Sequence, residues 1–232
     1  EGLYTKLGVL EDTLRRSKES GYRYIDWSGI FGDIDVYGPR EKAYAYGILR
    51  KISRGTRISK KDQLGREISK QQSEYFSKTV AKNSKGELIP LYHATDVEFE
   101  VFERGDFGYH IGDVNQAMDI ARDNNKRYIK EVYVNITNPV FFEFDAEMWD
   151  GSAVAYGLLE QNIISSDEYD TLSGLDGFWD NDSNSEANLT IKAMLKEKGY
   201  DGIVYKNDYE TKGLSFMAFD SNQIKYTSNT TP

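Results

Sequence analysis

Hydrophobic positions recur at helical spacing in the first ninety residues. Leu7, Leu10 and Leu14 predict one helix that ends near Gly21. Pro39 suits the first turn of a second helix. The apolar stripe of that second helix comprises Tyr44, Ala45, Ile48, Leu49 and Ile52. A third helix is expected from Ser69, because Ser69-x-x-Gln72 has the form of a capping box.

From Leu88 onward the pattern changes to short strands bounded by turn residues. Leu88–His93 is the first predicted strand. Tyr128–Ile136 is the clearest, since apolar and polar positions alternate along it, and Asn138-Pro139 is expected to end it. Two further strands are predicted at Gly202–Tyr205 and Phe216–Phe219.

Helices are predicted between these strands. Asp113-x-x-Gln116 and Ser183-x-x-Glu186 both have capping-box form, and Gly199 is expected to end the second of these helices. Residues 145–182 are acidic and weakly periodic, so we expect short helices mixed with loop there. The order of elements predicts an α+β fold, with a helical N-terminal region over 1–68 and a second domain over 69–232.

Composition excludes several classes of protein. The chain has 232 residues, of which 39% are hydrophobic and 29% charged, which is typical of a globular protein. It has no cysteine, which excludes disulfide frameworks, thiol nucleophiles and thiolate zinc sites, and fits a reducing cytoplasm. No apolar run reaches the ~18 residues of a membrane helix, so no membrane partner is expected. The first residue is Glu, from which we expect a piece of a longer protein.

Charge is unevenly distributed along the chain. Residues 1–91 hold 18 Lys and Arg against 12 Asp and Glu, whereas residues 92–232 hold 11 against 26. An acidic C-terminal part would repel a phosphate backbone, so binding of nucleic acid through bulk charge is not expected for 92–232. The basic stretch 50–85 could make a weak contact with nucleic acid, but its composition favours a solvated helical surface.

Candidate chemistry is confined to a few segments. The two histidines, His93 and His110, lie at or near the ends of predicted strands or turns. Without cysteine they make a weak zinc site, since the other ligands would be carboxylates with no recognisable spacing. A nucleophile-elbow serine, a P-loop and a Rossmann glycine motif are all absent from the sequence.

Four segments together resemble a known superfamily. They are Leu91–Thr95, Gly108–Gly112, Gly199–Tyr205 and Ser215–Ile224. In this order they resemble the ADP-ribosyltransferase superfamily, in the branch of the diphtheria toxin and poly(ADP-ribose) polymerases, and most closely the domains of bacteriophage polyvalent proteins. The resemblance covers about two-thirds of the chain and implies a split antiparallel sheet.

The resemblance also implies roles for the first two motifs. His93-Ala94-Thr95 is similar to the family motif in which the histidine bonds a ribose hydroxyl of NAD and the adjacent backbone binds the nicotinamide carboxamide. Gly108-Tyr-His-Ile111 is similar to the second motif, whose aromatic residue stacks on nicotinamide. His110 stands at that position, and Tyr109 is a neighbouring substitute.

The third motif departs from the polymerase pattern. Ser215 stands where those enzymes carry a catalytic glutamate, although a serine here resembles the phage-type domains. Glu210 is the nearest upstream carboxylate, and Asp220 is second choice. A carboxylate near the ribose would stabilise the oxocarbenium-like transition state. The other interpretation of Glu210 is a solvated loop charge.

The resemblance implies transfer of ADP-ribose from NAD to an unidentified protein or nucleic-acid acceptor, with release of nicotinamide and without a metal. Glu210, Ser215 and His93 are the expected catalytic residues. Such a toxin-like module would act in the cytoplasm of a bacterial host or belong to a phage particle. Two alternatives stay open: a non-catalytic structural or binding module of a phage, which Ser215 favours, and an NAD glycohydrolase.

Overall fold

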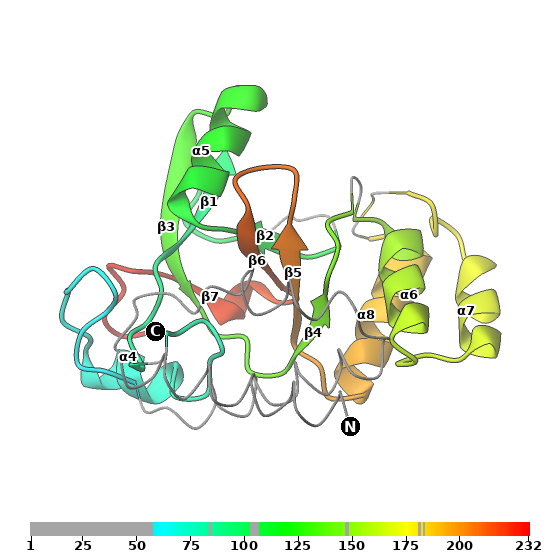
Figure 1. The fold of residues 1–232 in the computed structure, drawn as a ribbon, viewed down its shortest axis with the longest axis horizontal. Coiled ribbons are helices and arrows are strands. Elements are labelled where there is room, and N and C mark those ends of the chain that lie inside the picture. Colours follow the sequence, from blue (N-terminus) through cyan, green and yellow to red (C-terminus); the bar gives the residue numbers. More distant parts are fainter. Residues whose placement is uncertain (1–57, 84, 103–106, 147–148, 181, 183) are drawn as a thin grey trace, which may run out of the picture. The chain divides into compact units, whose positions relative to one another are not determined.

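The computed structural model describes residues 58–232, except 84, 103–106, 147–148, 181 and 183 (Figure 1). The described residues form two compact units, one of 58–90 with 228–232 and one of Leu91–Thr227. Helices and two sheets confirm the predicted α+β class. The two helices predicted before residue 58 lie outside the described residues, and the domain boundary at 68/69 stays a prediction.

The first unit contains one short helix, α4 (Lys70–Tyr75). The capping box predicted at its start is confirmed, because Ser69 Oγ accepts from Gln72 N at 3.0 Å and Gln72 Oε1 accepts from Ser69 N at 2.9 Å. Residues 58–68 hold turns and an isolated bridge, and no helix. The helical character of 1–68 as a whole stays a prediction, because residues 1–57 lie outside the described residues.

A turn centred on Asp62 explains why residues 58–68 are not helical. Asp62 Oδ1 accepts from the backbone N–H groups of Leu64 and Arg66, which folds the chain back on itself. Gly65 has φ +84° in that turn, a conformation that favours glycine. Lys82, within the basic stretch 50–85, has only 5% of its surface exposed. The other described lysines of the stretch are exposed, namely Lys60, Lys61, Lys70, Lys78 and Lys85. Its surface is therefore largely solvated as predicted, although only α4 is helical among the described residues.

The second unit contains two sheets. The first consists of β1 (Leu91–Thr95), β3 (Tyr128–Val134) and β7 (Ile224–Tyr226), in the antiparallel order β1-β3-β7. The second has the order β2-β6-β5-β4. Its strands are β2 (Tyr109–Ile111), β4 (Pro139–Phe142), β5 (Gly202–Asn207) and β6 (Gly213–Ala218). The pairing of β4 with β5 is parallel, whereas the other pairs are antiparallel.

Strand β4 was not predicted. We expected Asn138-Pro139 to end a strand, but β3 ends at Val134 and Pro139 begins β4. Pro139 is tolerated there because it is the first residue of an edge strand. The carboxylate of Asp201 fixes the connection, since it accepts from the backbone N–H groups of Thr137 and Asn138 at 2.8 and 2.7 Å.

Four helices belong to the second unit. They are α5 (Val114–Asp123), α6 (Gly151–Glu160), α7 (Ser166–Ser173) and α8 (Glu186–Glu197). Helix α5 starts at the predicted capping box and packs against β1 and β3. Ser185, rather than the predicted Ser183, caps α8. Gly199 follows the end of α8 with φ +85°, as the sequence predicts. A short 3-10 helix, η1 (Ser221–Gln223), precedes β7.

The hydrophobic core lies where α6 and α8 meet one face of the second sheet. Its fully buried members include Val154 and Leu158 from α6, Ile191 from α8, and Ile203 and Met217 from the sheet. Among the helices that the structure describes, none combines the length and apolar character needed to cross a membrane. Helix packing covers one face of the second sheet. The candidate site lies at one end of the same sheet, around the loop that joins β5 to β6.

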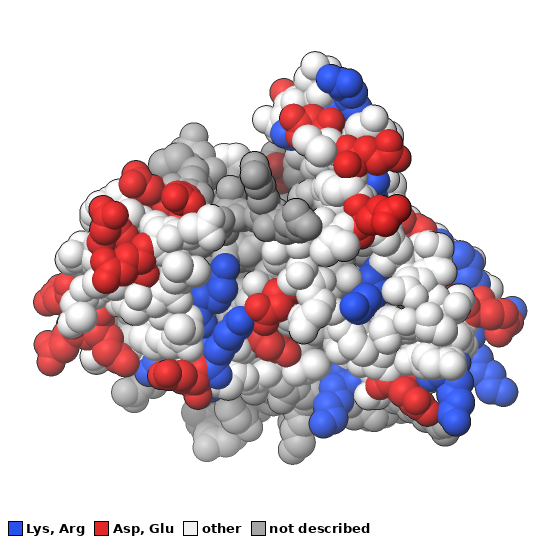
Figure 2. All heavy atoms as spheres, turned by 180° about the vertical axis from the view of Figure 1, so that it is seen from behind, with Lys and Arg blue, Asp and Glu red and all other residues white. Residues whose placement is uncertain are grey.

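Acidic side chains gather along the side of the second unit that carries α7 (Figure 2). Asp167 and Asp170 lie on α7, and Glu160 ends α6, all of them exposed. The acidic bias of residues 92–232 is not confined to these helices, since α5 also carries Asp119 and Asp123.

Gly202 tests the packing of the second sheet. A Cβ there would lie 2.9 Å from both Ile136 Cγ2 and the Met217 carbonyl oxygen. We expect Gly202→Ala to lower the free energy of unfolding by about 1–3 kcal/mol, because this overpacks a rigid core. Urea denaturation would measure it. Gly174→Ala is the matched control, since its Cβ would meet nothing closer than 3.6 Å. Equal stability of the two variants would contradict this account.

Candidate active site

The two histidines lie on adjacent strands. Tyr92 and Gly112 exchange two backbone hydrogen bonds, of 2.7 and 3.0 Å, which join β1 to the end of β2. His93 Nδ1 lies 2.8 Å from the carbonyl oxygen of His110. A carbonyl only accepts, so Nδ1 of His93 carries the hydrogen, and its Nε2 is the free ring nitrogen of the neutral form. The first two motifs thus meet in the folded chain.

Tyr109 and His110 point to opposite faces of β2, as successive strand residues must. The Tyr109 ring lies 5.7 Å from Phe102, and His93 lies 5.3 Å from the same ring. His110 instead lies 5.8 Å from each of the rings of Trp149 and Tyr205. Of the two candidates for nicotinamide stacking, Tyr109 therefore shares an aromatic group with His93, and His110 belongs to the other face.

Burial keeps both imidazoles neutral. It lowers the pKa of His93 below 6.5, and the hydrogen bond to the His110 carbonyl opposes this only partly. Burial, together with the nearby His93, lowers the pKa of His110 to about 4. His110 Nδ1 lies 3.0 Å from the Tyr205 hydroxyl, and its buried Nε2 has no hydrogen-bond partner among the described residues. Neither ring carries a charge at pH 7.

Ala94 and Thr95 complete β1 and are each only 8% exposed. The Thr95 hydroxyl accepts from Val97 N at 3.2 Å and so closes a local turn after the strand. The small side chain of Ala94 would let a ligand approach the backbone beside His93. Binding of a carboxamide by this backbone stays a prediction.

Glu210 is connected to Ser215 through one buried side chain. Asn207, at the end of β5, is 2% exposed, and its Nδ2 donates to Glu210 Oε2 at 2.6 Å and to Ser215 Oγ at 3.1 Å. Its Oδ1 accepts from the backbone N–H of Glu210 at 3.0 Å. Glu210 is half-buried and held in one orientation, which argues against a freely solvated loop charge.

Ser215 lies beneath this arrangement. It is 2% exposed, and its hydroxyl donates to Gln116 Oε1 at 3.2 Å while it accepts from Asn207. Tyr205 stands opposite it on β5. Because its hydroxyl is buried and bonded to Gln116 and Asn207, Ser215 is placed to act on a ligand through Asn207 and Glu210.

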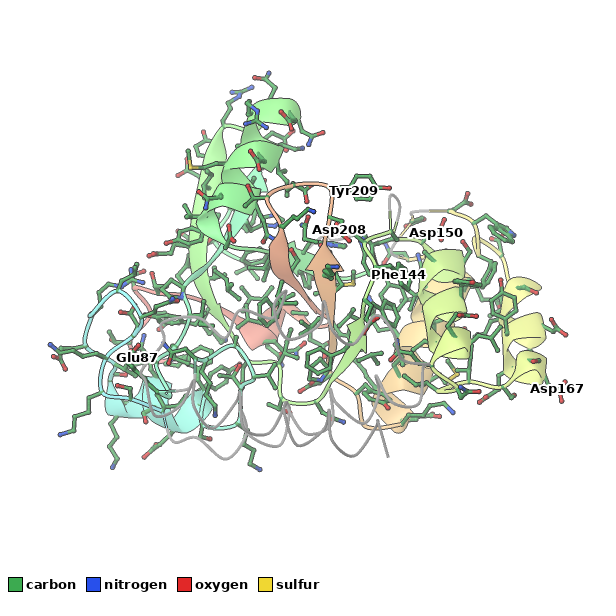
Figure 3. The ribbon with its side chains drawn as sticks, in the orientation of Figure 1. Glu87, Phe144, Asp150, Asp167, Asp208 and Tyr209 are labelled. Carbon is green, nitrogen blue, oxygen red and sulfur yellow. The ribbon has the colours of Figure 1, made fainter. Side chains whose placement is uncertain are left out.

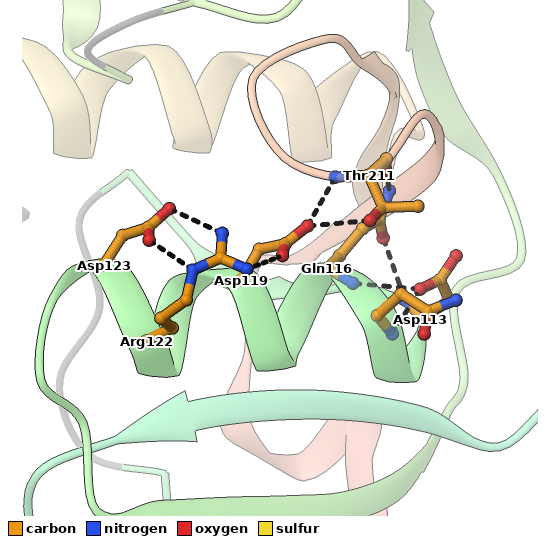
Figure 4. A network of polar contacts seen from close by, with 7 residues as sticks. Asp113, Gln116, Asp119, Arg122, Asp123 and Thr211 are labelled. Atoms are coloured by element: carbon orange, nitrogen blue, oxygen red, sulfur yellow. Dashed lines mark hydrogen bonds and ion pairs between the residues drawn. The ribbon is translucent and has the colours of Figure 1, made fainter.

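Helix α5 holds the loop that carries Glu210 from one side (Figure 4). Gln116 Nε2 donates to the carbonyl of Thr211 at 3.0 Å. Asp119 Oδ2 accepts from Thr211 N at 3.0 Å and from its hydroxyl at 2.7 Å. The hydrogen bonds from Thr211 hold the pKa of the Asp119 carboxyl below its ordinary value, and Arg122 adds to this. The loop between β5 and β6 is therefore tethered to a helix far away in the sequence.

Asp145 lies beside the same loop, and the sequence did not point to it. The Trp149 indole donates to Asp145 Oδ1 at 3.2 Å, and the nearby backbone N–H groups of Asp208 and Tyr209 lower the pKa of this carboxyl. Burial raises the pKa of Asp145 to about 6, and the charge of Glu210 adds to the rise. The unpredicted strand β4 delivers this carboxylate, so the missed signal was the apolar run that begins at Pro139.

Trp149 is itself fixed by flat ring contacts. Its plane lies within 5° of that of Phe142 and within 6° of that of Phe144, at centroid distances of 5.8 and 6.2 Å. The Tyr205 ring approaches to 4.5 Å on a tilted plane. Asp208 and Tyr209 are the first two residues of the β5–β6 loop. Figure 3 shows them on the side of the unit where Phe144 and Asp150 also lie. These aromatic contacts orient the indole N–H toward Asp145.

Asp220, the second-choice carboxylate, lies at the far end of β6. Five residues separate it from Ser215, which in a strand corresponds to about 16 Å. Its carboxylate is exposed and pairs with Lys196 at 2.7 Å. Within the part of the chain that the structure describes, no three histidine or carboxylate side chains come together as ligands for a metal. Of the two candidate carboxylates, Glu210 is therefore the one joined to Ser215, through Asn207.

Comparison with known proteins gives one family. The family model described as ADP-ribosyltransferase in polyvalent proteins matches residues 83–232. No curated protein matches the chain. A solved structure, described as the crystal structure of an anti-CRISPR protein, aligns with 57% of this chain and 90% of its own at 10% identity, with a TM-score of 0.29. Similarity that low carries no argument about fold or function.

The imidazole environment can be tested by nuclear magnetic resonance, because the chain has only two histidines. We expect His110 to take up a proton only as the pH falls through about 4, since burial lowers its pKa. His93 should be half-protonated only at a pH lower than that of an ordinary imidazole, since burial lowers its pKa. A pH titration of the ring carbon and nitrogen shifts measures both, and His110→Gln assigns the signals. An imidazole at position 110 that titrates near 6.5 would contradict the burial described above.

Proposed function

Since this chain belongs to the family of ADP-ribosyltransferases in polyvalent proteins, we propose that it cleaves NAD and transfers ADP-ribose to a macromolecular acceptor. The family supplies a domain of ADP-ribosyltransferase type over residues 83–232. NAD as substrate and the transfer itself are the proposed part. Bacteriophage origin and action inside a bacterial host or a phage particle belong to the same proposal.

The observation that carries the proposal is a series of neighbouring side chains that links the second motif to Glu210. His110 Nδ1 lies 3.0 Å from the Tyr205 hydroxyl, and Tyr205 stands opposite Ser215 in the register of β5 and β6. Asn207 then bridges Ser215 and Glu210. His93 joins the same series through the His110 carbonyl. Residues that the resemblance selects from four separate segments are therefore coupled within one unit of the fold.

The proposed reaction breaks the bond between C1′ of the ribose and the nicotinamide nitrogen. The electron pair of this bond leaves with nicotinamide, which departs neutral, and the positive charge of NAD⁺ passes to the ribosyl group. A nucleophile of the acceptor then forms a bond to C1′ and loses its proton to a base or to water. The enzyme must stabilise the ribosyl cation and bring the nucleophile close.

Each residue has a defined part in this reaction. The Glu210 carboxylate stabilises the ribosyl cation and bonds the ribose 2′-hydroxyl. His93 accepts a ribose hydroxyl at Nε2, since its Nδ1 is occupied by the His110 carbonyl. The backbone at Ala94 and Thr95 binds the carboxamide, and Tyr109 or His110 contacts the nicotinamide ring. Ser215 is a positioning residue, because it acts through Asn207.

Two other functions use the same residues differently. An NAD glycohydrolase would pass ADP-ribose to water and leave no macromolecule modified. A binding or structural module would hold NAD, or a related ligand, without turnover. The serine at position 215 favours the second, and the fixed orientation of Glu210 favours an enzyme.

Release of nicotinamide tests the proposal directly. We expect the protein to release nicotinamide from NAD, and Glu210→Gln to lower the rate about 100-fold, because a preorganised charge is lost from the transition state. Liquid chromatography measures nicotinamide, and mass spectrometry of a host extract detects ADP-ribosylated macromolecules.

Asp208→Asn is the matched control, since this exposed carboxylate lies two residues from Glu210. It should retain the wild-type rate within about twofold. Nicotinamide no higher than in a His93→Ala sample would leave the binding module as the better interpretation. Free ADP-ribose without any modified macromolecule would identify a glycohydrolase.

A further inference from the structure

Two carboxylates, and not one, converge at the proposed site. Glu210 comes from the β5–β6 loop, and Asp145 comes from the segment after β4. The parallel register places Phe142 opposite Tyr205, so the segment after β4 and the start of the β5–β6 loop leave the sheet at the same end. Among the described residues neither carboxylate has a lysine or arginine partner, although other acidic groups of the unit do.

Asp145 is half-buried beside the site. The Trp149 indole donates to its carboxylate at 3.2 Å, and the backbone N–H groups of Asp208 and Tyr209 lie near enough to lower its pKa. These two residues directly precede Glu210 in the chain, so Asp145 lies beside the loop that presents Glu210. The parallel rings of Phe142 and Phe144 in turn fix the indole.

Two negative charges without a cation are costly in a half-buried site. The titratable groups that act on Asp145 are Glu210 from the β5–β6 loop and Tyr205 from β5. His110 lies across the Tyr205 and Trp149 rings and is neutral at pH 7. None of these groups compensates the carboxylates, so a cationic ligand would relieve their repulsion.

We propose that Asp145 is a second functional carboxylate of this site, which fixes the loop carrying Glu210 and adds its charge beside the cationic nicotinamide ribose of NAD⁺. This inference rests on the proposed function, because it names the part of the substrate that the carboxylate pair recognises. The positive charge of NAD⁺ lies on the nicotinamide ring before cleavage and on the ribose during it. A pair of carboxylates favours both states.

Binding of NAD⁺ at two pH values tests the charge of Asp145. Titration calorimetry of the whole chain would compare the wild type with Asp145→Asn, which keeps the shape and the acceptor for the indole. At pH 8 we expect the variant to bind NAD⁺ about tenfold more weakly, since one carboxylate charge is lost. At pH 5 the two proteins should bind alike, because the pKa of Asp145 is about 6 and most of its carboxyl is then neutral.

Asp208→Asn serves as the control. It removes a carboxylate charge from the same loop, but this charge is exposed and therefore screened by water. It should differ from the wild type by less than about twofold at either pH. Circular dichroism checks that each variant is folded.

The outcomes separate this inference from the proposed function. Equal affinity of wild type and Asp145→Asn at pH 8 would overturn the inference and leave the function standing. A loss of the same size at both pH values would make Asp145 a structural residue and would also overturn it. A folded wild type that binds no NAD⁺ at either pH would overturn both.

Discussion

The site depends on hydrogen bonds among three buried polar side chains, two amides and one hydroxyl. Gln116, Asn207 and Ser215 are each at most 2% exposed, and each would destabilise the fold if its polar atoms lacked partners. They satisfy one another, and their remaining donors and acceptors hold the backbone at Thr211 and Glu210. A carboxylate on a surface loop is thereby held by the interior of the protein, which is how a flexible connection can present a fixed charge.

Helix α5 shows how one residue can serve both stability and function. Gln116 closes the capping box with Asp113 at 2.8 Å, and the same amide contacts Ser215 and Thr211. The helix packs on the first sheet, whereas Ser215 belongs to the second. The residue that completes the cap of this helix therefore also connects the two sheets. Selection for helix capping alone would accept glutamate here, but a glutamate lacks the Nε2 donor to Thr211.

Much of the fold could be predicted from local pattern, and the gaps have physical reasons. The capping residues Ser69 and Asp113 and the terminal Gly199 act through neighbours within a few residues, so the sequence displays them. Strand β4 was missed because Asn138-Pro139 is typical of a strand end, while its short apolar run has no periodicity. Asp145 could not be found without that strand. The pairing of β4 with β5, which lies about sixty residues later in the chain, brings Asp145 toward the loop of Glu210. The burial of Ser215 comes from tertiary contacts that no local pattern encodes.

The parallel pairing of β4 with β5 also has a consequence for how the protein matures. Parallel neighbours need a crossover, and here it contains α6, α7 and α8 before the chain returns to the sheet. Contacts that close so long a loop form slowly, after the local helices and hairpins. During synthesis, Asp145 leaves the ribosome well before the β5–β6 loop beside which it lies. Strands β2 and β4 also leave the ribosome before β6 and β5, with which they pair, so the second sheet and the candidate site on it assemble only after the last strands are made.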